Sequence, residues 1–247
     1  MEMVDTLQKL KNENERLVVE LEEAYEQLQT TVVDSQTERD IIYAELREKI
    51  QKYQQLFLGT LKVLTAAIET KDPSTRGHSA RVNDYSKAIG VELGLSDEQL
   101  EFLQYAALLH DVGKIGIDEK ILCKPGTLNK MEWGTVKEHP LMGANIIEPI
   151  ELFSDILPFV LHHHEAFDGE GYPRGLKGSE IPYGARIIAV ADVFDAMTSD
   201  RPYRKAHSVA AAIDEIKEKA GTQFDPTVVE AFLSAIEKGK ITFKKTD

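Results

Sequence analysis

Apolar residues in the first third of the chain recur at alternating spacings of three and four, which is the heptad repeat of a coiled-coil helix. One row of core-facing positions covers residues 7–28 and a second covers residues 46–67, with mostly Glu, Lys and Gln between them. This stretch has no proline, and its first glycine is Gly59. The repeat therefore predicts a long N-terminal coiled-coil helix over residues 1–67.

The two rows are out of phase with each other. Leu28 and Leu46 are 18 residues apart, two heptads plus four, and the shift coincides with the largely polar residues 30–40. Such a shift is a stutter, which loosens a coil without ending it. Asn14 takes a core-facing position, where asparagine selects a parallel two-stranded coil at some cost in stability. We therefore expect a homodimer through this helix, which would act as a signalling stalk; the alternative is a single solvated helix packed against its own domain.

Residues 71–77 break this helix, and short amphipathic segments with helix caps follow. Ser96 and Gln99 form a capping box, while Asp225 and Pro226 begin the last segment. The predicted helices cover residues 78–93, 97–110, 129–138, 141–150, 155–164, 184–198, 208–220 and 226–238. No run of alternating apolar and polar residues indicates a strand, so we expect an all-α domain over residues 68–247.

Charge and cysteine content narrow the classes of function. The 247 residues include 42 acidic and 29 basic side chains, a net charge of −13, which argues against a nucleic-acid polymer or an anionic membrane as partner. An anionic ligand therefore needs a local positive site. Cys123 is the single cysteine, which excludes an internal disulfide and a Cys-rich zinc site. No apolar run approaches the roughly 20 residues that span a bilayer, and we expect a cytoplasmic protein.

Histidines are concentrated in one part of the chain. Five of the seven lie between residues 108 and 173. His110 and Asp111 follow a run of apolar residues, and charged groups at the buried end of a helix need a metal ion or a partner. The alternative for this pair is a simple His–Asp hydrogen bond at the surface.

A second cluster, residues 162–164, contains three adjacent imidazoles at the end of another apolar segment. They cannot all pack in a core, so at least one is expected to be a ligand. His78 and His139 each lie beside a helix-breaking residue. Asp192 and Asp195 lie on an otherwise apolar segment, where a carboxylate is costly without a positive partner.

These motifs together resemble a known family. His-Asp-x-Gly-Lys at residues 110–114 is followed about fifty residues later by His-His-Glu-x-x-Asp-Gly-x-Gly-Tyr-Pro at residues 163–173. This pairing is similar to the HD-GYP family of cyclic di-GMP phosphodiesterases, over roughly residues 68–236. Shorter motifs in the family's order include Glu69-Thr70-Lys71-Asp72, Arg76-Gly77-His78 and Asp200-Arg201-Pro202-Tyr203-Arg204. The resemblance implies an HD-superfamily helical domain with the HD-GYP extension.

The same resemblance implies roles for individual residues. It gives seven ligands for two metal ions, with Asp111 bridging both: His78, His110, Asp111, His139, His163, His164 and Asp192. Asp111 and Lys114 are the expected catalytic residues, Lys114 facing the phosphate. The expected substrate contacts are Arg201, Arg204, Lys205 and Tyr172, although Tyr172 could equally be a packing residue. Ser74 stands where members with a third metal have glutamate, and His162 falls outside the usual ligand pair.

The activity implied is metal-dependent hydrolysis of the bacterial second messenger cyclic di-GMP to linear pGpG, GMP or both, by a water that two metal ions activate. Mixed His and carboxylate ligands suit divalent transition metals, and the family suggests iron or manganese. The alternatives are a phosphodiesterase for another cyclic dinucleotide, an HD-type nucleotide phosphohydrolase, or a non-catalytic cyclic di-GMP sensor. An upstream sensor or receiver domain, or a GGDEF-domain partner, would fit the stalk.

Overall fold

The computed structural model describes residues 2–71, 76–200 and 205–242. Among the first 18 residues it describes few side chains, and Asn14 is not one of them. The described residues are helical and contain no strand, which confirms the all-α prediction. None of the described helices is long and apolar enough to cross a bilayer.

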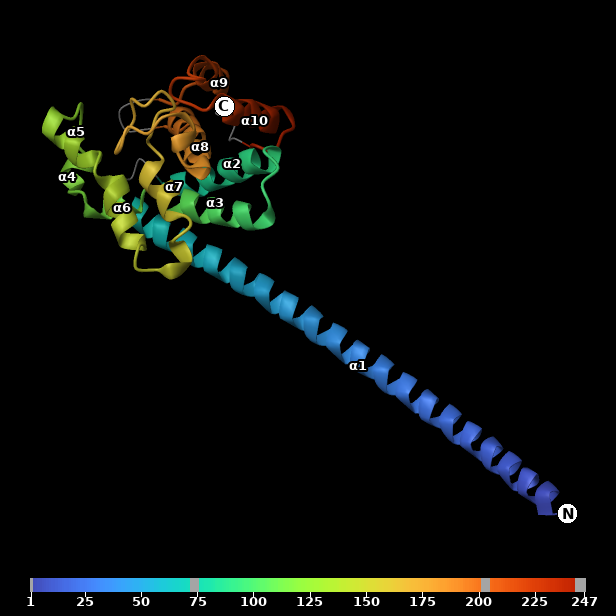
Figure 1. Ribbon diagram of the computed structural model, residues 1–247. Helices are drawn as coiled ribbons and strands as arrows, with labels where there is room; N and C mark the ends of the chain where they lie inside the picture. The colour runs from blue at the N-terminus through green and yellow to red at the C-terminus, as the bar shows by residue number, and fades with distance from the viewer. Residues whose placement is uncertain (1, 72–75, 201–204, 243–247) are drawn as a thin grey trace. The chain divides into compact units, whose positions relative to one another are not determined.

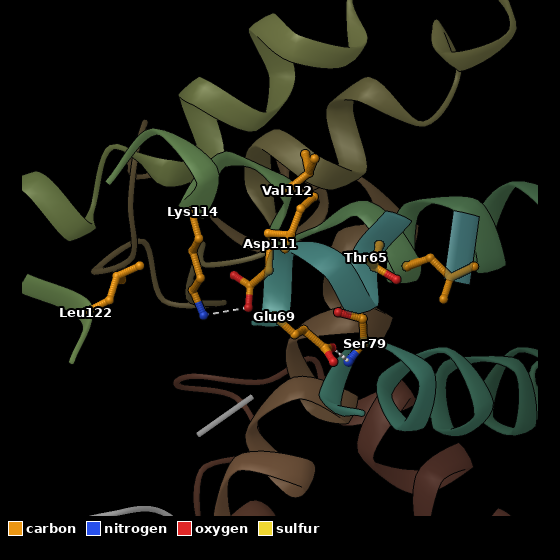
Figure 2. A pocket seen from close by; sticks show the side chains of 9 residues that line it. Thr65, Glu69, Ser79, Asp111, Val112, Lys114 and Leu122 are labelled. Carbon is orange, nitrogen blue, oxygen red and sulfur yellow. Dashed lines mark hydrogen bonds and ion pairs between the residues drawn. The ribbon is translucent and has the colours of Figure 1, made fainter. Parts of the chain in front are cut away.

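A single helix, α1 (Glu2–Glu69), occupies the first part of the chain, as the heptad repeat predicts (Figure 1). Contacts divide the chain into two compact units, Met1–Phe57 and Leu58–Asp247. The last turns of α1 therefore belong to the second unit, and Leu61 and Thr65 are buried there. Thr65 and Glu69 line a small pocket together with Asp111 (Figure 2). The predicted domain boundary after residue 67 stays a prediction.

The second unit consists of short helices. After α1 come α2 (His78–Glu92), α3 (Asp97–Leu109), η2 (Val112–Gly116), α4 (Glu119–Leu122), α5 (Lys130–Val136), α6 (His139–Ile147), η3 (Glu151–Phe153), α7 (Leu157–His162), η4 (Gly178–Glu180), α8 (Tyr183–Thr198), α9 (Val209–Glu218) and α10 (Pro226–Glu237).

The caps that were read from the sequence determine where several of these helices begin. The Ser96 side chain accepts a hydrogen bond from the Gln99 amide, and the full capping box is present. Asp225 caps α10 by accepting from the Thr227 amide. Gly94 follows α2 with a φ of 72°, a conformation that glycine adopts without steric cost.

Most helix boundaries differ from the predictions by one to three residues, and three of these differences have a clear local cause or lie at the histidines. The segment that carries His110 ends one residue earlier, at Leu109, and a 3-10 turn, η2, follows. Helix α6 begins at His139 because Pro140 is compatible with the first turn of a helix, and Pro158 has the same place in α7. The shortest elements, α4 and the three 3-10 turns, are too brief to show a helical period in the sequence.

Helix α8 forms the centre of the core. Ile187, Ile188, Val190 and Phe194 are fully buried, and the Phe194 ring packs edge-to-face on Tyr85 of α2, 5.3 Å between centroids. Each such buried side chain stabilises the fold by about 1.5–3 kcal/mol. The consequence for the site is that the polar residues of α8 are held on a rigid element.

Candidate metal centre

Seven side chains that can bind metal lie together in two adjacent groups. Within each group the candidate ligand atoms all lie within 4.8 Å of one another. One group consists of His78, His110 and Asp192, and the other of Asp111, His139, His163 and His164. These are the seven residues that the family resemblance implies as ligands, and the fold brings all of them together.

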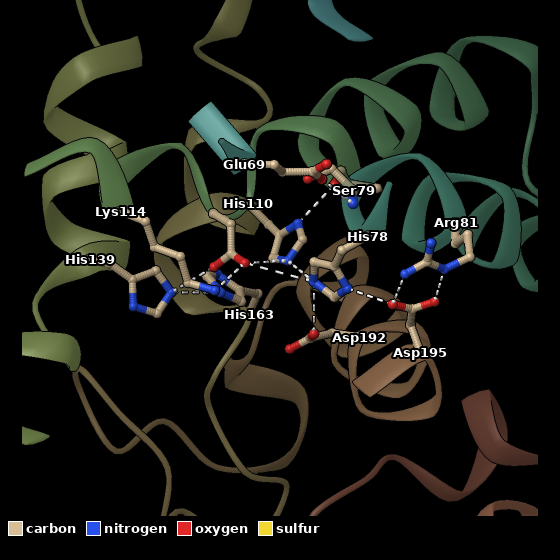
Figure 3. A network of polar contacts seen from close by, with 12 residues as sticks. Glu69, His78, Ser79, Arg81, His110, Lys114, His139, His163, Asp192 and Asp195 are labelled. Atoms are coloured by element: carbon tan, nitrogen blue, oxygen red, sulfur yellow. Dashed lines mark hydrogen bonds and ion pairs between the residues drawn. The ribbon is translucent and has the colours of Figure 1, made fainter. Parts of the chain in front are cut away.

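Figure 3 labels candidate ligands of both groups, and the distances from Asp111 place this residue between them. Its Oδ1 is 3.2 Å from Nε2 of His139, and its Oδ2 is 3.5 Å from Nε2 of His110 and 3.7 Å from Nε2 of His78. One carboxylate oxygen therefore faces each group, which is the arrangement that a bridging ligand requires.

The ends of several elements supply these side chains. His78 is the first residue of α2, His110 caps the end of α3, and Asp111 precedes η2. His139 begins α6, and His163 follows α7. Residues at helix ends escape the regular packing of a helix face, so their side chains can converge on a common point. Asp192 differs, because it projects from the middle of α8.

Three imidazoles are oriented by the carbonyl three residues before them. Nδ1 of His110 lies 2.8 Å from the Ala107 carbonyl oxygen, and Nδ1 of His163 lies 2.7 Å from that of Val160. His139 makes the same contact with Val136, at 2.7 Å. Because Nδ1–H donates to a carbonyl, Nε2 is left as a lone-pair donor that points into the centre.

The protonation states also suit a cation. Burial lowers the pKa of His110 and His163, and lowers that of His164 to about 3, so these rings are neutral. Burial raises the pKa of Asp111 and Asp192, but Lys114 and neighbouring imidazoles outweigh it at Asp111, and imidazoles alone outweigh it at Asp192, so both pKa values lie well below the usual range. Neutral imidazoles beside ionised carboxylates are the donor set of a divalent transition-metal site.

His78 is oriented differently from the other rings. Its Nδ1 lies 2.7 Å from Oδ2 of Asp195, and Asp195 is in turn held by Arg81 at 2.5 Å and 3.0 Å. Burial lowers the pKa of His78, but the carboxylates of Asp192, Asp195 and Asp111 outweigh it and raise it to about 9. The ring of His78 is therefore protonated and balances these carboxylates, and a metal cation at this position would balance their charge in place of the proton.

Sequence reasoning noted Asp195 only as a costly carboxylate, and it missed Arg81. A signal was available, because Arg81 follows His78 by three residues on α2 and Asp195 follows Asp192 by three on α8. Residues three apart share a helix face.

His162 lies outside both groups, as predicted. Its Nδ1 is 3.3 Å from Oε1 of the buried Glu165. Glu165 accepts hydrogen bonds from the backbone amides of Arg174 and Leu176, at 2.8 Å and 3.1 Å. Glu165 therefore fixes the Gly-Tyr-Pro loop against the end of α7.

Beside the centre lies an open hollow of about 450 Å³. Tyr172 lines it and stacks on His164, 4.8 Å between ring centroids at 28°. Trp133 and Lys137 are among the other lining residues that the sequence analysis did not single out. Nζ of Lys137 lies 5.0 Å from the centroid of the Tyr172 ring and 5.8 Å from that of Trp133. The hollow thus combines aromatic surfaces with a cation, next to the candidate ligands.

The other residues predicted for the site do not all lie at the centre or along the hollow. Nζ of Lys114 donates to Oδ2 of Asp111 at 2.6 Å, so this lysine is part of the centre. Lys205 is exposed and does not line the hollow. Arg201, Arg204 and Ser74 lie outside the described residues.

Comparison with known proteins identifies the family of this chain. The model of the HD domain family matches residues 62–228. A cyclic di-GMP phosphodiesterase of Thermotoga maritima is 42% identical over 191 residues, which cover 75% of this chain and 51% of that protein. A 3'3'-cGAMP-specific phosphodiesterase of Vibrio cholerae is 40% identical over 169 residues, which cover 68% of this chain and 37% of that protein. The match thus spans about half of the length of the Thermotoga relative and 37% of that of the Vibrio relative.

A crystal structure of a cyclic GMP-AMP specific phosphodiesterase from Vibrio cholerae shares the fold, with a TM-score of 0.62 at 21% sequence identity. The superposition covers 74% of this chain and 49% of that one.

Proposed function

This chain belongs to the HD domain family, and we propose that it is a metal-dependent phosphodiesterase that hydrolyses cyclic di-GMP to linear pGpG, GMP or both. The observation that carries the proposal is the position of Asp111, with one oxygen toward each of two groups of histidine and aspartate ligands. The name of the Thermotoga relative supports the substrate.

The donor set fits two divalent transition-metal ions. His78, His110 and Asp192 would hold one, and His139, His163 and His164 the other, with Asp111 shared between them. Nitrogen and carboxylate donors favour manganese, iron, cobalt or zinc over calcium or magnesium, and we infer iron or manganese. When bound, such ions supply charge neutralisation and an activated water.

The residues around the ligands have separate tasks in this proposal. Arg81 and Asp195 orient His78. Lys114, beside Asp111, contacts the scissile phosphate. Trp133 and Tyr172 receive the bases, because aromatic faces stack on any nucleobase. Arg201, Arg204 and Lys205 remain proposed phosphate contacts, which would supply positive charge in a chain with a net charge of −13.

A second candidate substrate is 3'3'-cGAMP, since a relative of that specificity is 40% identical. It shares the phosphodiester ring and one guanine with cyclic di-GMP, so the same centre would act on it. An HD-type nucleotide phosphohydrolase or a non-catalytic sensor is less well supported, because every expected ligand is present and the wide hollow lies beside them.

We further propose a cytoplasmic location, where the single Cys123 remains a thiol. The proposed organisation is a signalling stalk over residues 1–67 and a catalytic domain over residues 68–247, with the stalk forming a parallel homodimer. Input would come from an upstream sensor or receiver domain, or from a GGDEF-domain partner.

The proposal is tested by metal analysis and turnover on one preparation. We expect close to two transition-metal ions per chain, hydrolysis of cyclic di-GMP, loss of turnover on chelation and recovery on adding iron or manganese. Cyclic di-AMP, 3'3'-cGAMP and nucleoside triphosphates serve as competing substrates, and chromatography identifies the product. Active protein with one ion or none would contradict the two-ion centre, and turnover of nucleoside triphosphates alone would contradict the substrate.

Asp111→Ala gives a direct test of the shared ligand. The substitution removes one donor from each group, so we expect turnover to fall on the order of 10³-fold or more and both ions to bind more weakly. Metal content and single-turnover rates measure this. An Asp111→Ala protein that keeps both ions would show that the two groups bind metal independently.

A further inference from the structure

The end of α1 reaches the metal centre. Thr65 and Glu69 line the same small pocket as Asp111 and Lys114 (Figure 2). Lys71, just beyond α1, donates from Nζ to the carbonyl oxygens of Ile115 and Ile117, at 2.7 Å and 3.3 Å. These two carbonyls lie at the end of the turn that follows Asp111, so the segment after α1 is fixed close to the site.

Glu69 makes two contacts that surround one ligand. Its Oε2 accepts from the backbone N–H of Gly77 at 2.6 Å, and its Oε1 accepts from that of Ser79 at 2.8 Å. His78 is the residue between these two amides in the chain, and Figure 3 shows its side chain together with those of Glu69 and Ser79. Both carboxylate oxygens are thus used to hold the backbone on either side of His78.

Helix α2 needs this external partner. The first amides of a helix have no acceptor within the helix, and a side chain normally supplies one. The residue before α2 is Gly77, which has no side chain and makes no cap of its own. Glu69 supplies the missing cap from another helix, and its charge suits the positive end of the α2 dipole.

His78 also lacks the orienting contact that other rings have. Nδ1 of His110, His139 and His163 donates to a carbonyl three residues earlier, within the same local turn. His78 is the first residue of α2, and its Nδ1 contacts Asp195 instead. The place of the ring therefore depends on groups distant in sequence: Asp195 for the ring itself and Glu69 for the backbone that carries it.

We infer that Glu69 is a positioning residue for His78, and that the end of α1 thereby sets the geometry of one ligand group. The inference rests on the proposed function, because it treats the group of His78, His110 and Asp192 as an ion site. Loss of the Glu69 cap loosens this group. The group of His139, His163 and His164 keeps its ion, since carbonyls of their own segments orient the first two of these rings.

The test compares the full chain with Glu69→Ala and Glu69→Gln. We expect one of the two ions to bind about 10- to 100-fold more weakly in Glu69→Ala, while the other keeps its affinity. Glu69→Gln retains one acceptor oxygen, so its affinity for that ion should lie between those of the wild type and Glu69→Ala. Cobalt(II) titration followed by visible absorption distinguishes the two ions by their spectra. Ser208→Ala is the matched control, because it removes the cap of α9 in the same unit without a ligand beside it.

A metal-free measurement separates this inference from the proposed function. Amide exchange at Gly77, His78 and Ser79 should be faster in both Glu69 variants, whether or not the wild type binds metal, and unchanged in Ser208→Ala. Unchanged exchange in Glu69→Gln, or equal weakening of both ions, would overturn the positioning role. Wild-type protein that binds no ion would instead overturn the proposed function, and the exchange result would still decide the role of Glu69 as a cap.

Discussion

Among individual residues, the orientation of Nε2 in three imidazoles has the largest consequence for metal binding. Carbonyl contacts at Nδ1 direct Nε2 of His110, His139 and His163 inward. Burial then keeps the rings of His110 and His163 neutral by lowering their pKa. These candidate donors are therefore already oriented, which would reduce the entropy that binding of an ion must overcome.

Lys137 is the residue whose role in substrate binding is most easily isolated. It lies over the hollow with its ammonium near Tyr172 and Trp133. Lys137→Met removes the charge but keeps most of the side-chain length, so we expect KM for cyclic di-GMP to rise about 10-fold, with kcat and metal content unchanged. A factor of 10 corresponds to about 1.4 kcal/mol, within the range of a charge-assisted hydrogen bond.

Lys130→Met is the control for this prediction. Lys130 begins α5, the helix that ends just before Lys137, and it is exposed and does not line the hollow. Steady-state kinetics of the two variants should therefore differ. Equal effects would mean that Lys137 acts only through the overall charge of the protein.

Between elements, η2 and α6 approach each other closely beside two candidate ligands, Asp111 and His139. A Cβ added at Gly113 would lie 2.0 Å from the carbonyl oxygen of His139 and 2.5 Å from the amide nitrogen of Gly143. Only glycine permits this contact. Gly113→Ala should destabilise the fold by about 1–3 kcal/mol or more and displace His139.

Thermal melting and metal content measure this effect. Gly134→Ala is the opposite case, because nothing lies within 4 Å of its added Cβ in α5. There we expect a small gain, up to about 1 kcal/mol, from helix propensity. A Gly113→Ala protein with unchanged melting temperature would show that the two elements can separate without cost.

A second contact between elements predicts a pH dependence. Glu92, at the end of α2, is paired with Lys238 and Lys240 after α10, and these lysines together with Ser234 lower its pKa from 4.5 to about 2. A pKa lowered in the folded state stabilises the fold above the unfolded value, and this contribution is lost as the pH falls from about 4.5 to about 2.

Glu92→Gln should therefore melt at a lower temperature than the wild type at pH 7, and the difference should close in that acidic window. Glu230→Gln, at an exposed position on α10, is the control and should change little. A difference between Glu92→Gln and the wild type that stayed constant down to pH 2 would attribute the effect to packing and not to charge.

Whether an interaction could be predicted from the sequence depended on how far apart its two residues lie along the chain. Ser96 and Asp225 were recognised as caps because their partners are two or three residues away. The seven candidate ligands were predicted from the resemblance to a family, which a single residue pattern would not have provided. Asp195 with Arg81 was not predicted as a pair, because the two are separated by 114 residues and meet only through the packing of α2 on α8. The spacing of three residues places Arg81 on the helix face of His78 and Asp195 on that of Asp192, but it does not show that the two faces meet.

For the molecule as a whole, the relevant feature is the exposed apolar surface of α1. Leu21, Leu28 and Ile50 of its heptad rows are exposed in the single chain. Apolar rows of this kind are buried by a second helix in a coiled coil. We therefore expect the full chain to be a dimer in solution and the chain without residues 1–40 to show weaker dimerisation.

Light scattering of both proteins tests the dimer, and insertion of one to four residues near Ser35 tests signalling through the coil. Each inserted residue rotates the part of the helix before it relative to the part after it. Turnover should therefore vary with the number of inserted residues if this rotation affects the site. A deletion protein that remains fully dimeric would exclude the first heptad row as the interface, and turnover indifferent to insertion would make α1 a passive tether.

The hollow beside the centre also provides an optical reporter. Trp133 is the only tryptophan among the 247 residues, and it lines the hollow with about half of its surface exposed. All indole fluorescence of the protein therefore originates at the place where a nucleobase would stack. Quenching of this emission in metal-free protein, which cannot turn over, would measure cyclic dinucleotide affinity without a label, and Trp133→Phe supplies the blank.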